Sequence, residues 1–597
     1  MERFRLGVLL PISTFLCFCV SCAAPPAASG GDGGATPASS ALERLLEDAW
    51  QFRLREDPLL ATRAGDHRYD HLLPAVSEPD QQRRLQAERD YLERLLRIPK
   101  ADLSHDEQVS YDVFRRLAED RIREAEFRTY RIPITNREGF HVSFPQLPDE
   151  TPLATVADYE HYIARLEGFL AYERQHVALM REGIATGWVL PRVVLEGIEG
   201  ALQAHIVEQP QQSLLYRPFQ DFPDSLPAEQ RGRLEDAGRR AIQQSVVPGY
   251  REFLQFMRDE YLPAARPGIA ASDLPGGREY YAFKLRSYTT LDLTPEQVHA
   301  TGQSEVARIQ GEMQGVMARV GFSGSIAAFA DALRNDPRFH PRTPEELMQR
   351  TAYVLKKMDG ELPKLFATLP RMPYGIKPIP DFIAPKTTTA YYDAPAGDGT
   401  RAGFYAVNLY DLPSRPLYEV EALSLHEAVP GHHLQIALQQ ELEDLPAFRR
   451  FDGFTVFVEG WALYAERLGL EVGFYQDPYS DFGRLTYEMW RACRLVVDTG
   501  MHALGWSRQQ AIDFMLANTA LSRRNIEAEV DRYISWPGQA LAYKTGELRI
   551  RELRARAERE LGPRFDLRVF HDVVLRSGSV PLDVLEQNVT RWIEESR

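Results

Sequence analysis

Cysteine is scarce in this sequence, which has four in 597 residues. Cys17, Cys19 and Cys22 lie at the N-terminus, so Cys493 is the only cysteine in the rest of the chain. A single cysteine cannot form an intramolecular disulfide, and this excludes a disulfide-based scaffold. Because Trp490 and Leu495 lie close to it in the sequence, we expect Cys493 to be a buried small apolar side chain rather than a nucleophile.

An excess of basic charge and a long apolar segment are also missing. The chain has 70 Lys and Arg residues against 85 Asp and Glu residues, a formal net charge of −15. This balance argues against nonspecific binding to nucleic acid, which depends on a basic surface. The apolar run from Leu6 to Val20 contains a proline and is shorter than the roughly 20 residues expected of a membrane span.

The N-terminus resembles a bacterial lipoprotein signal. Arg3 and Arg5 precede the apolar run, and small residues lead to Cys22, which would carry the lipid after cleavage. Cys19 stands where leucine is usual, so simple secretion stays open. We predict a signal peptide over 1–22 and a flexible tether over 23–40, rich in Ala, Pro, Gly and Ser. The protein is then exported, either to the periplasm or as a cell-envelope lipoprotein that contacts the membrane through its lipid only.

Residues 41–597 are predicted to form a mainly α-helical catalytic region. Apolar residues recur at helical spacing, and several segments begin with the capping-box pattern. These starts are Ser104 with Glu107, Thr294 with Gln297, Thr343 with Glu346, and Ser507 with Gln510. Polar or Pro/Gly-rich stretches allow a division into an N-terminal helical half, 41–265, and a second half, 266–597. Two segments, 387–392 and 404–409, lack this helical spacing. With the Asp398-Gly399 turn between them, they predict a small β-sheet.

The chemistry of the chain is concentrated in EALSLHEAVPGHHLQ and the later FVEGWALYAE. These segments hold His426, Glu427, His432 and Glu459. Two imidazoles and a carboxylate can bind a divalent ion and leave one position open for water, which catalysis requires. In the common H-E-x-x-H motif the Glu beside the first His acts as the base. We therefore predict one Zn²⁺ ion, although this ligand set does not exclude cobalt or manganese.

The spacing of the two histidines departs from that motif. Six positions on a regular helix place His426 and His432 about 9 Å apart along the axis and some 120° apart around it. His433 returns to the same face but lies about 10.5 Å away. Two nitrogens on one zinc ion must lie within roughly 3.5 Å of each other, so neither pair fits a straight helix. Pro430 and Gly431 can interrupt a helix, and we predict a break there that swings His432 toward His426.

HEAVPGHHLQ followed by EGWALYAE resembles the bacterial family catalogued as domain of unknown function number 885, whose members are regarded as candidate zinc metallopeptidases. The resemblance extends from roughly Ala41 to the C-terminus. It implies a large helical metallopeptidase-like fold with the small sheet next to the active-site helix. It favours His432 over His433 as ligand, and Glu459 over Glu466 because the family pattern centres on EGWA.

Further residues are candidates for supporting roles. Glu466 lies seven positions after Glu459 on the same helical face and could hold an imidazole N–H, and Gln435 could orient a ligand. Asp498 and His502 have the i, i+4 spacing of a hydrogen-bonded pair. Candidates to stabilise the oxyanion are Tyr533, Tyr543 and His502. Candidates to receive a substrate carboxylate are Arg491, Arg494 and Lys544. Tyr405 to Asn408 either form an edge strand that pairs with the substrate backbone or belong to a hairpin packed in the core.

Three functions fit these observations. The first is a zinc-dependent peptidase, with Glu427 as general base, and a resemblance to helical oligopeptidases implies short peptide substrates. The second is a metal-binding or scaffolding lipoprotein that has lost turnover because of the widened histidine spacing. The third keeps the zinc hydrolase chemistry but acts on another amide or on an ester.

Overall fold

The computed structural model describes residues 36–381 and 383–597. The predicted signal peptide, Cys22 and most of the predicted tether lie outside the described residues. The first helix begins at Pro37, so residues 37–40, which were predicted to be tether, are helical. In the part of the chain that the structure describes, no helix has the length and apolar character needed to cross a membrane.

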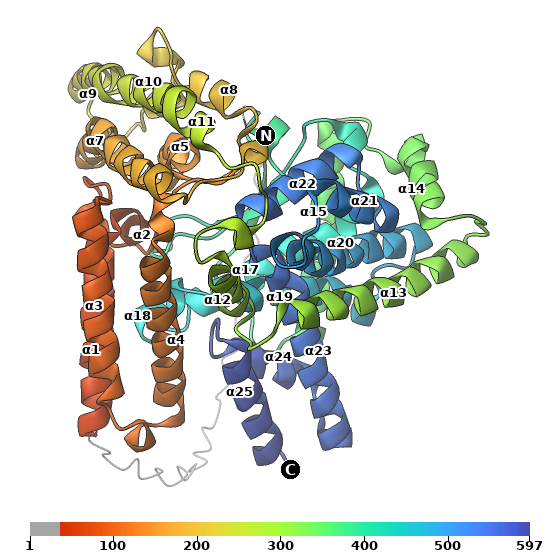
Figure 1. The fold of residues 1–597 in the computed structure, drawn as a ribbon. Coiled ribbons are helices and arrows are strands. Elements are labelled where there is room, and N and C mark those ends of the chain that lie inside the picture. The colour runs from red at the N-terminus through yellow and green to blue at the C-terminus, as the bar shows by residue number, and fades with distance from the viewer. Residues whose placement is uncertain (1–35, 382) are drawn as a thin grey trace, which may run out of the picture.

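Helices make up most of the regular structure, as predicted (Figure 1). The helices of the N-terminal part are α1 (Pro37–Glu56), α2 (Pro58–Arg63), α3 (Glu78–Leu96), α4 (His105–Phe127), α5 (Phe140–Ser143), α6 (Leu147–Glu150), α7 (Val156–Thr186), α8 (Ile198–Gln203), α9 (Ala228–Ala241), α10 (Val247–Phe256) and α11 (Leu262–Ala264). In Figure 1, α1, α3 and α4 run side by side, and α7, α9 and α10 lie above them.

The remaining helices follow in the second part of the chain. They are α12 (Gly277–Thr289), α13 (Pro295–Arg319), α14 (Ile326–Asn335), α15 (Pro344–Leu365), α16 (Val420–Glu427), α17 (His432–Gln440), α18 (Ala447–Phe451), α19 (Thr455–Leu468), α20 (Pro478–His502), α21 (Arg508–Asn518), α22 (Arg523–Ser535), α23 (Ala542–Leu561), α24 (Leu567–Leu575) and α25 (Leu582–Glu595). Helix α20 is central to this part, since every residue from Ser480 to His502 is buried.

Three of the four predicted capping boxes are present, at Ser104, Thr294 and Ser507. At the fourth site, Thr343 caps α15 by accepting from the backbone N–H of Glu346. The Glu346 carboxylate, however, accepts from the backbone N–H of Arg342 rather than from Thr343, so the box is not closed. These local signals therefore fixed where the helices begin, as the sequence pattern predicted.

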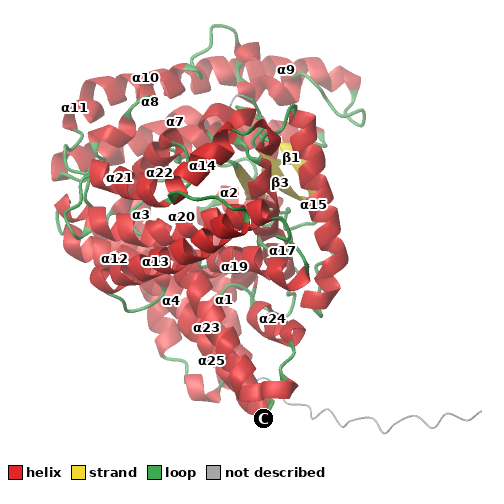
Figure 2. Cartoon of the chain, turned by 90° about the vertical axis from the view of Figure 1, so that its right-hand side faces the viewer, coloured by secondary structure: helices red, strands yellow, loops and turns green. Residues whose placement is uncertain are grey.

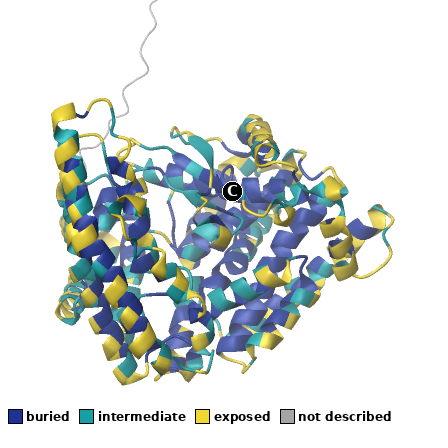
Figure 3. Cartoon of the chain, turned by 90° about the horizontal axis from the view of Figure 1, so that it is seen from above, coloured by how far each residue is buried: buried dark blue, intermediate teal, exposed yellow. Residues whose placement is uncertain are grey.

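One cluster of buried apolar side chains extends from Ala38 in α1 to Ile593 in α25. Figure 3 shows these buried residues in the interior and the exposed residues on the outer faces of the peripheral helices. Two close helix contacts within this core depend on glycine. A Cβ at Gly302 of α13 would lie 2.7 Å from Val496 of α20, and one at Gly460 of α19 would lie 2.5 Å from the Cα of Gly546 of α23. Small residues thus let α19 approach α23 closely, and α19 carries part of the candidate site.

The predicted small sheet is present and has one strand more than expected. It consists of β1 (Tyr374–Pro378), β2 (Ala390–Asp393) and β3 (Gly403–Val407) in the order β1-β3-β2. Strand β3 pairs in parallel with β1 and antiparallel with β2. Figure 2 shows the strands beside α15, and β2 contacts α16.

The prediction that Tyr405 to Asn408 form an edge strand for substrate is wrong. Both sides of β3 are already hydrogen-bonded to neighbouring strands, which leaves no free backbone edge there. Tyr405 is 1 % exposed. The Asn408 amide donates to the carbonyls of Ala384, Thr387 and Thr388, so Asn408 holds the loop before β2 in place.

Candidate metal centre

The helix break predicted at the Pro-Gly step is present. Helix α16 ends at Glu427, α17 begins at His432, and Ala428 and Gly431 adopt non-helical backbone angles between them. A Cβ at Gly431 would lie 1.9 Å from the carbonyl oxygen of His426, so only glycine fits where the chain turns back. The Trp461 indole N–H donates to the carbonyl of Pro430 over 2.8 Å and ties the break to α19.

This break brings the two imidazoles together. The ring centroids of His426 and His432 are 4.8 Å apart, with the rings nearly perpendicular. The Glu459 Oε2 atom lies 3.5 Å from Nε2 of His426 and 3.5 Å from Nε2 of His432. The three potential ligand atoms all lie within 4.8 Å of one another. No other group of three such side chains converges in this way among the described residues.

The residues fit a divalent metal ion. Ligand atoms each about 2.1 Å from one ion are separated by roughly 3.5 Å, which matches the spacing between Glu459 and each histidine. The Glu459 Oε2 atom is buried and has no hydrogen-bond donor among the described residues. A buried carboxylate oxygen without a partner is costly, and a cation between it and the two nitrogens removes that cost.

The hydrogen bonds of His426 and His433 show that these two histidines have different roles. The Nδ1 atom of His426 donates to Glu466 Oε1 over 2.8 Å, which leaves the lone pair on Nε2 to face Glu459. His433 has partners on both ring nitrogens, the hydroxyl of Tyr392 at 2.8 Å and the carbonyl of Met372 at 3.1 Å. The structure therefore directs His432 toward the centre and His433 toward the sheet.

Charges around the centre favour the charged forms of both Glu459 and His426. Burial raises the pKa of Glu459, but His432 and His426 outweigh it and hold that pKa well below its ordinary value. Burial lowers the pKa of His426, but Glu459 and Glu466 outweigh it and raise that pKa to about 9. The two carboxylates therefore favour a positive charge at His426, which either a proton or a metal ion supplies.

Glu427 lies at the end of α16, directly before the break, and is 8 % exposed. Burial raises the pKa of its carboxyl group, and the neighbouring His426 and His432 partly offset this. All three ligand side chains act on this pKa, so Glu427 lies within electrostatic reach of the whole centre. A carboxylate beside the ligands can accept a proton from water in the centre.

The structure places most of the other predicted site residues in a separate buried group. We call this group the α20 network; it comprises Arg494, Asp498 and His502 of α20, Tyr533 of α22, and Tyr543 and Lys544 of α23. Within the described residues, none of these side chains hydrogen-bonds to His426, His432 or Glu459. Their polar atoms bind other parts of the protein instead.

The oxyanion candidates His502 and Tyr533 both hydrogen-bond to other parts of the fold. His502 accepts from the backbone N–H of Ala271 and donates to the carbonyl of Tyr533, both over 2.9 Å. The Tyr533 hydroxyl accepts from Trp490 and Arg494. The predicted bond between Asp498 and His502 is absent, because Asp498 accepts from Tyr281 and from the backbone of Gly538.

The remaining members of the α20 network are also engaged. The Tyr543 hydroxyl lies 3.3 Å from donors on Arg532 and Gln539. Arg494 donates to Glu529 as well as Tyr533. Lys544 is fully buried and pairs with three carboxylates, those of Glu488, Glu547 and Glu305, at 2.8, 2.9 and 3.0 Å. A substrate carboxylate would have to displace all three partners of Lys544, so the prediction for Lys544 is wrong in this structure. The Nη1 atom of Arg494 is buried without a partner among the described residues, so the role of Arg494 stays a prediction. The Gln435 amide N–H donates to Gln439, and its carbonyl oxygen is buried without a partner among the described residues, so its role in orienting a ligand stays a prediction.

Two contributors were not predicted as part of the site. Tyr392 of β2 holds His433 away from the centre, and Trp461 fixes the helix break. These contacts join residues that are 41 and 31 positions apart in the sequence. Trp461 stands in EGWA, yet no local pattern indicates that its indole reaches Pro430. The guanidinium of Arg491, a predicted receptor for a substrate carboxylate, lies 3.7 Å from Glu466, the partner of His426.

Fold and site together define a predominantly helical protein with a buried His/His/Glu centre at a broken helix. The family model described as "Bacterial protein of unknown function (DUF885)" matches residues 58–589. The chain therefore belongs to this DUF885 family, as its resemblance implied. Among curated proteins, none matches the chain significantly.

Two solved structures share the fold over nearly the whole chain. The "putative lipoprotein from Colwellia psychrerythraea" is 30 % identical with a TM-score of 0.89, and the match covers 94 % of this chain and 99 % of that one. A "putative lipoprotein of unknown function from Shewanella oneidensis" is 20 % identical with a TM-score of 0.68, covering 93 % and 99 %. The second likeness concerns the fold alone.

Proposed function

We propose that the protein is a zinc-dependent peptidase that hydrolyses short peptides. The observation that carries this proposal is the convergence of His426, His432 and Glu459, with Glu427 directly after the first of them. Two imidazoles and one carboxylate leave a further coordination position open, as in catalytic rather than structural zinc sites. Histidine nitrogens with a carboxylate suit zinc, and Glu466 supports the set from outside by holding His426.

The side chains of the centre divide the work of peptide hydrolysis. Zinc, when bound, supplies a Lewis acid that polarises the peptide carbonyl and lowers the pKa of water. Glu427 accepts a proton from the attacking water and then delivers it to the leaving amine as the C–N bond breaks. Glu466 keeps His426 in the tautomer whose Nε2 lone pair faces the centre. Both ring nitrogens of His502 already have partners, which disfavours His502 as the oxyanion donor.

We further propose that the protein is a lipoprotein anchored through Cys22 and active at the cell envelope. The signal-like N-terminus supports this location, and the structural neighbour from Colwellia psychrerythraea carries the description of a putative lipoprotein. Labelling with a radioactive fatty acid tests the anchor. Label should enter the wild-type chain and be absent from a Cys22→Ala variant.

The peptidase proposal is tested by the Glu427→Gln variant on a library of short peptides. We expect kcat/KM to fall by about 10² to 10⁴, the usual contribution of a general base, while the zinc content stays unchanged. The matched control is Glu443→Gln, because the Glu443 side chain is 74 % exposed and pairs with Arg371 rather than with a residue of the centre. A fully active Glu427→Gln variant would remove Glu427 from the mechanism.

The same assay separates the alternatives. Zinc at full occupancy without cleavage of any peptide in the wild-type protein would favour a metal-binding or scaffolding role. Cleavage of ester or non-peptide amide substrates alone, still dependent on Glu427, would retain the hydrolase chemistry and reject the peptidase.

A further inference from the structure

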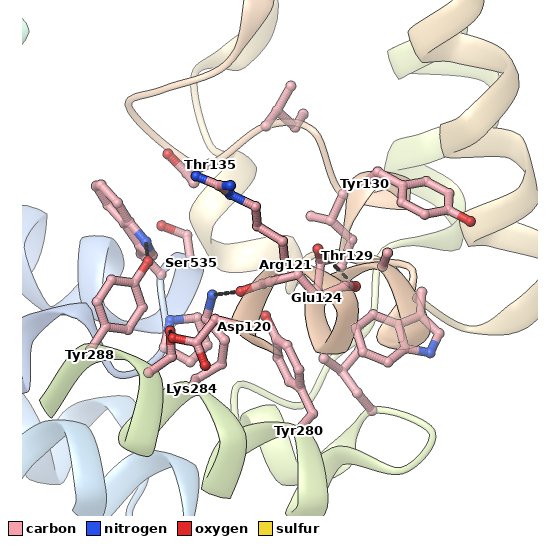
Figure 4. Close-up of a pocket in the computed structure, with 18 of the residues that line it drawn as sticks. Asp120, Arg121, Glu124, Thr129, Tyr130, Thr135, Tyr280, Lys284, Tyr288 and Ser535 are labelled. Carbon is pink, nitrogen blue, oxygen red and sulfur yellow. Dashed lines mark hydrogen bonds and ion pairs between the residues drawn. The ribbon is translucent and has the colours of Figure 1, made fainter. Parts of the chain in front are cut away.

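A cavity of about 600 Å³ lies between α3, α4, α12 and the turn after α22 (Figure 4). This volume is within the range of sites that bind small ligands, roughly 300 to 1,000 Å³. Trp188, Tyr280 and Trp536 contribute aromatic walls. The three candidate metal ligands are not among the lining residues, so the cavity is a separate feature of the molecule.

Helix α19 joins this cavity to the candidate metal centre. Its first residue, Thr455, lines the cavity, and Glu459 follows one turn later on the same face, about 6 Å along the axis. Within α19, only Thr455, Val458, Glu459 and Arg467 are not buried. The first three occupy positions i, i+3 and i+4, so the partly buried residues at the start of α19 share one helix face, which runs from Thr455 in the cavity wall to Glu459.

The cations that line the cavity already have partners. Arg121 pairs with Glu88 and with Asp452. Arg266 donates to the carbonyls of Val189, Gly268 and Ala270. Lys284 pairs with Glu124, and Figure 4 shows the two side chains meeting. A carboxylate entering the cavity would compete with these partners.

Two carboxylates of α4 retain free hydrogen-bonding capacity. The Asp120 Oδ1 atom has no hydrogen-bond donor among the described residues, and the nearest guanidinium nitrogen, on Arg286, is 4.0 Å from it. The other oxygen of Asp120 accepts only from the hydroxyl of Ser287, over 3.2 Å. Glu124 binds Lys284 through one oxygen, and its side chain is 31 % exposed. The lining cations thus have partners, whereas Asp120 and Glu124 keep acceptor capacity for a ligand that brings a positively charged donor.

We infer that the cavity receives the free amino end of a short peptide. Its ammonium group binds Asp120, with Glu124 one helical turn away, and its first side chain packs against the aromatic walls. The peptide then extends along Thr455 and Val458 toward His426, His432 and Glu459. This inference rests on the proposed peptidase function and adds that cleavage takes place near a free N-terminus.

The test compares peptides of one sequence with a free and with an acetylated N-terminus. We expect the wild-type enzyme to prefer the free peptide by at least about tenfold in kcat/KM, the effect of one hydrogen bond between charged groups. Asp120→Asn should reduce this preference to about twofold or less, mainly through a higher KM for the free peptide. The matched control Asp292→Asn should keep it, because Asp292 also pairs with Arg286 but has a 91 % exposed side chain. Equal cleavage of both peptides by the wild type, or an unchanged preference in Asp120→Asn, would overturn the inference.

A second variant and a binding measurement keep the two proposals distinguishable. Ala125 of α4 lines the cavity, and Ala125→Trp should fill it and abolish binding of a free tripeptide, measured by calorimetry in the Glu427→Gln background. Zinc content and the melting temperature monitor the fold of this variant. Tripeptide binding that depends on Asp120, without hydrolysis by the wild type, would support the cavity and reject the peptidase. If the wild type hydrolyses peptides but neither Asp120→Asn nor Ala125→Trp changes tripeptide binding, the result would support the peptidase and reject the cavity as a binding site.

Discussion

The candidate metal centre and the α20 network are both buried and rich in charge, yet they differ in how their polar atoms are satisfied. In the centre, the nitrogens of His426 and His432 face a Glu459 oxygen that has no hydrogen-bond donor among the described residues. In the α20 network, Lys544 has three carboxylate partners, and both ring nitrogens of His502 are bound. The α20 network also has an unpartnered atom, Nη1 of Arg494, but only the centre brings several potential ligand atoms together among the described residues. We therefore expect a ligand site to be marked by potential ligand atoms that converge, whereas burial and charge by themselves mark either kind of region.

The largest effect on stability is expected from a substitution of Lys544, which pairs with three carboxylates of the α20 network and its surroundings. Lys544→Met leaves the carboxylates of Glu305, Glu488 and Glu547 without their shared cation. Removing one member of a buried ion pair costs about 3 to 5 kcal/mol, so we expect the free energy of unfolding to fall by that amount. Denaturant unfolding measures it. Unchanged stability, or loss of zinc from the folded variant, would erase the distinction between the two regions.

The next effect concerns the support of the metal centre. Glu466→Gln removes the charge that holds the Nδ1 proton of His426, and we expect zinc affinity to fall about 10- to 100-fold. Competition with a fluorescent zinc chelator measures the dissociation constant, with Glu443→Gln as the control. If affinity stays unchanged while the protein loses stability, Glu466 belongs with the structural charges.

A smaller effect is expected inside the α20 network. Tyr533→Phe removes the acceptor for Trp490 and Arg494, and unsatisfied buried donors cost about 1 to 3 kcal/mol. We expect this loss in the free energy of unfolding and no change in kcat beyond about threefold, since the hydroxyl contacts Trp490 and Arg494 and not the candidate metal ligands. A fall in kcat of about 10² or more in folded protein would restore Tyr533 as an oxyanion donor.

The last comparison concerns unpartnered atoms that do not converge. Both oxygens of Glu173 in α7 are buried without a hydrogen-bond partner in the described chain, and burial raises the pKa of this carboxyl to about 8. Between the ordinary value of 4.5 and about 8, the folded chain keeps a proton that the unfolded chain has released. The free energy of unfolding therefore falls as the pH rises through this window, on the order of 1 kcal/mol per pH unit.

Glu173→Gln should remove this pH dependence. We expect the variant to gain stability relative to the wild type between about pH 5 and about pH 8, as measured by denaturant unfolding. Parallel profiles for the two proteins would mean that Glu173 has a partner at these pH values. Zinc content should not respond, because Glu173 is not part of a converging ligand group.

Local chemistry allowed much of the fold and the core of the site to be predicted. Capping residues such as Ser104 and Thr294 act within one helical turn, so their effect is visible in the sequence. The break at Pro430 and Gly431 was predictable because two histidines on a straight helix cannot reach one ion. Steric and geometric limits of this kind depend on few residues.

The partners of long polar side chains were not predictable in the same way. Tyr533 and Lys544 carry chemistry suited to catalysis, but their roles depend on which groups other helices bring to them. The position of β3 at the centre of the sheet likewise depends on β1, about 30 residues upstream, whose Gly375 pairs with Phe404. Non-local pairing is decided by packing of the whole chain, which single-sequence patterns do not report.

The central claim is that His426, His432 and Glu459 hold one metal ion while His433 does not. Elemental analysis of protein purified without chelators tests it in three forms: wild type, His426→Ala and His433→Gln. We predict about one zinc ion per chain in the wild type and in His433→Gln, and nearly none in His426→Ala. Full zinc content in His426→Ala, or its loss in His433→Gln alone, would contradict the claim.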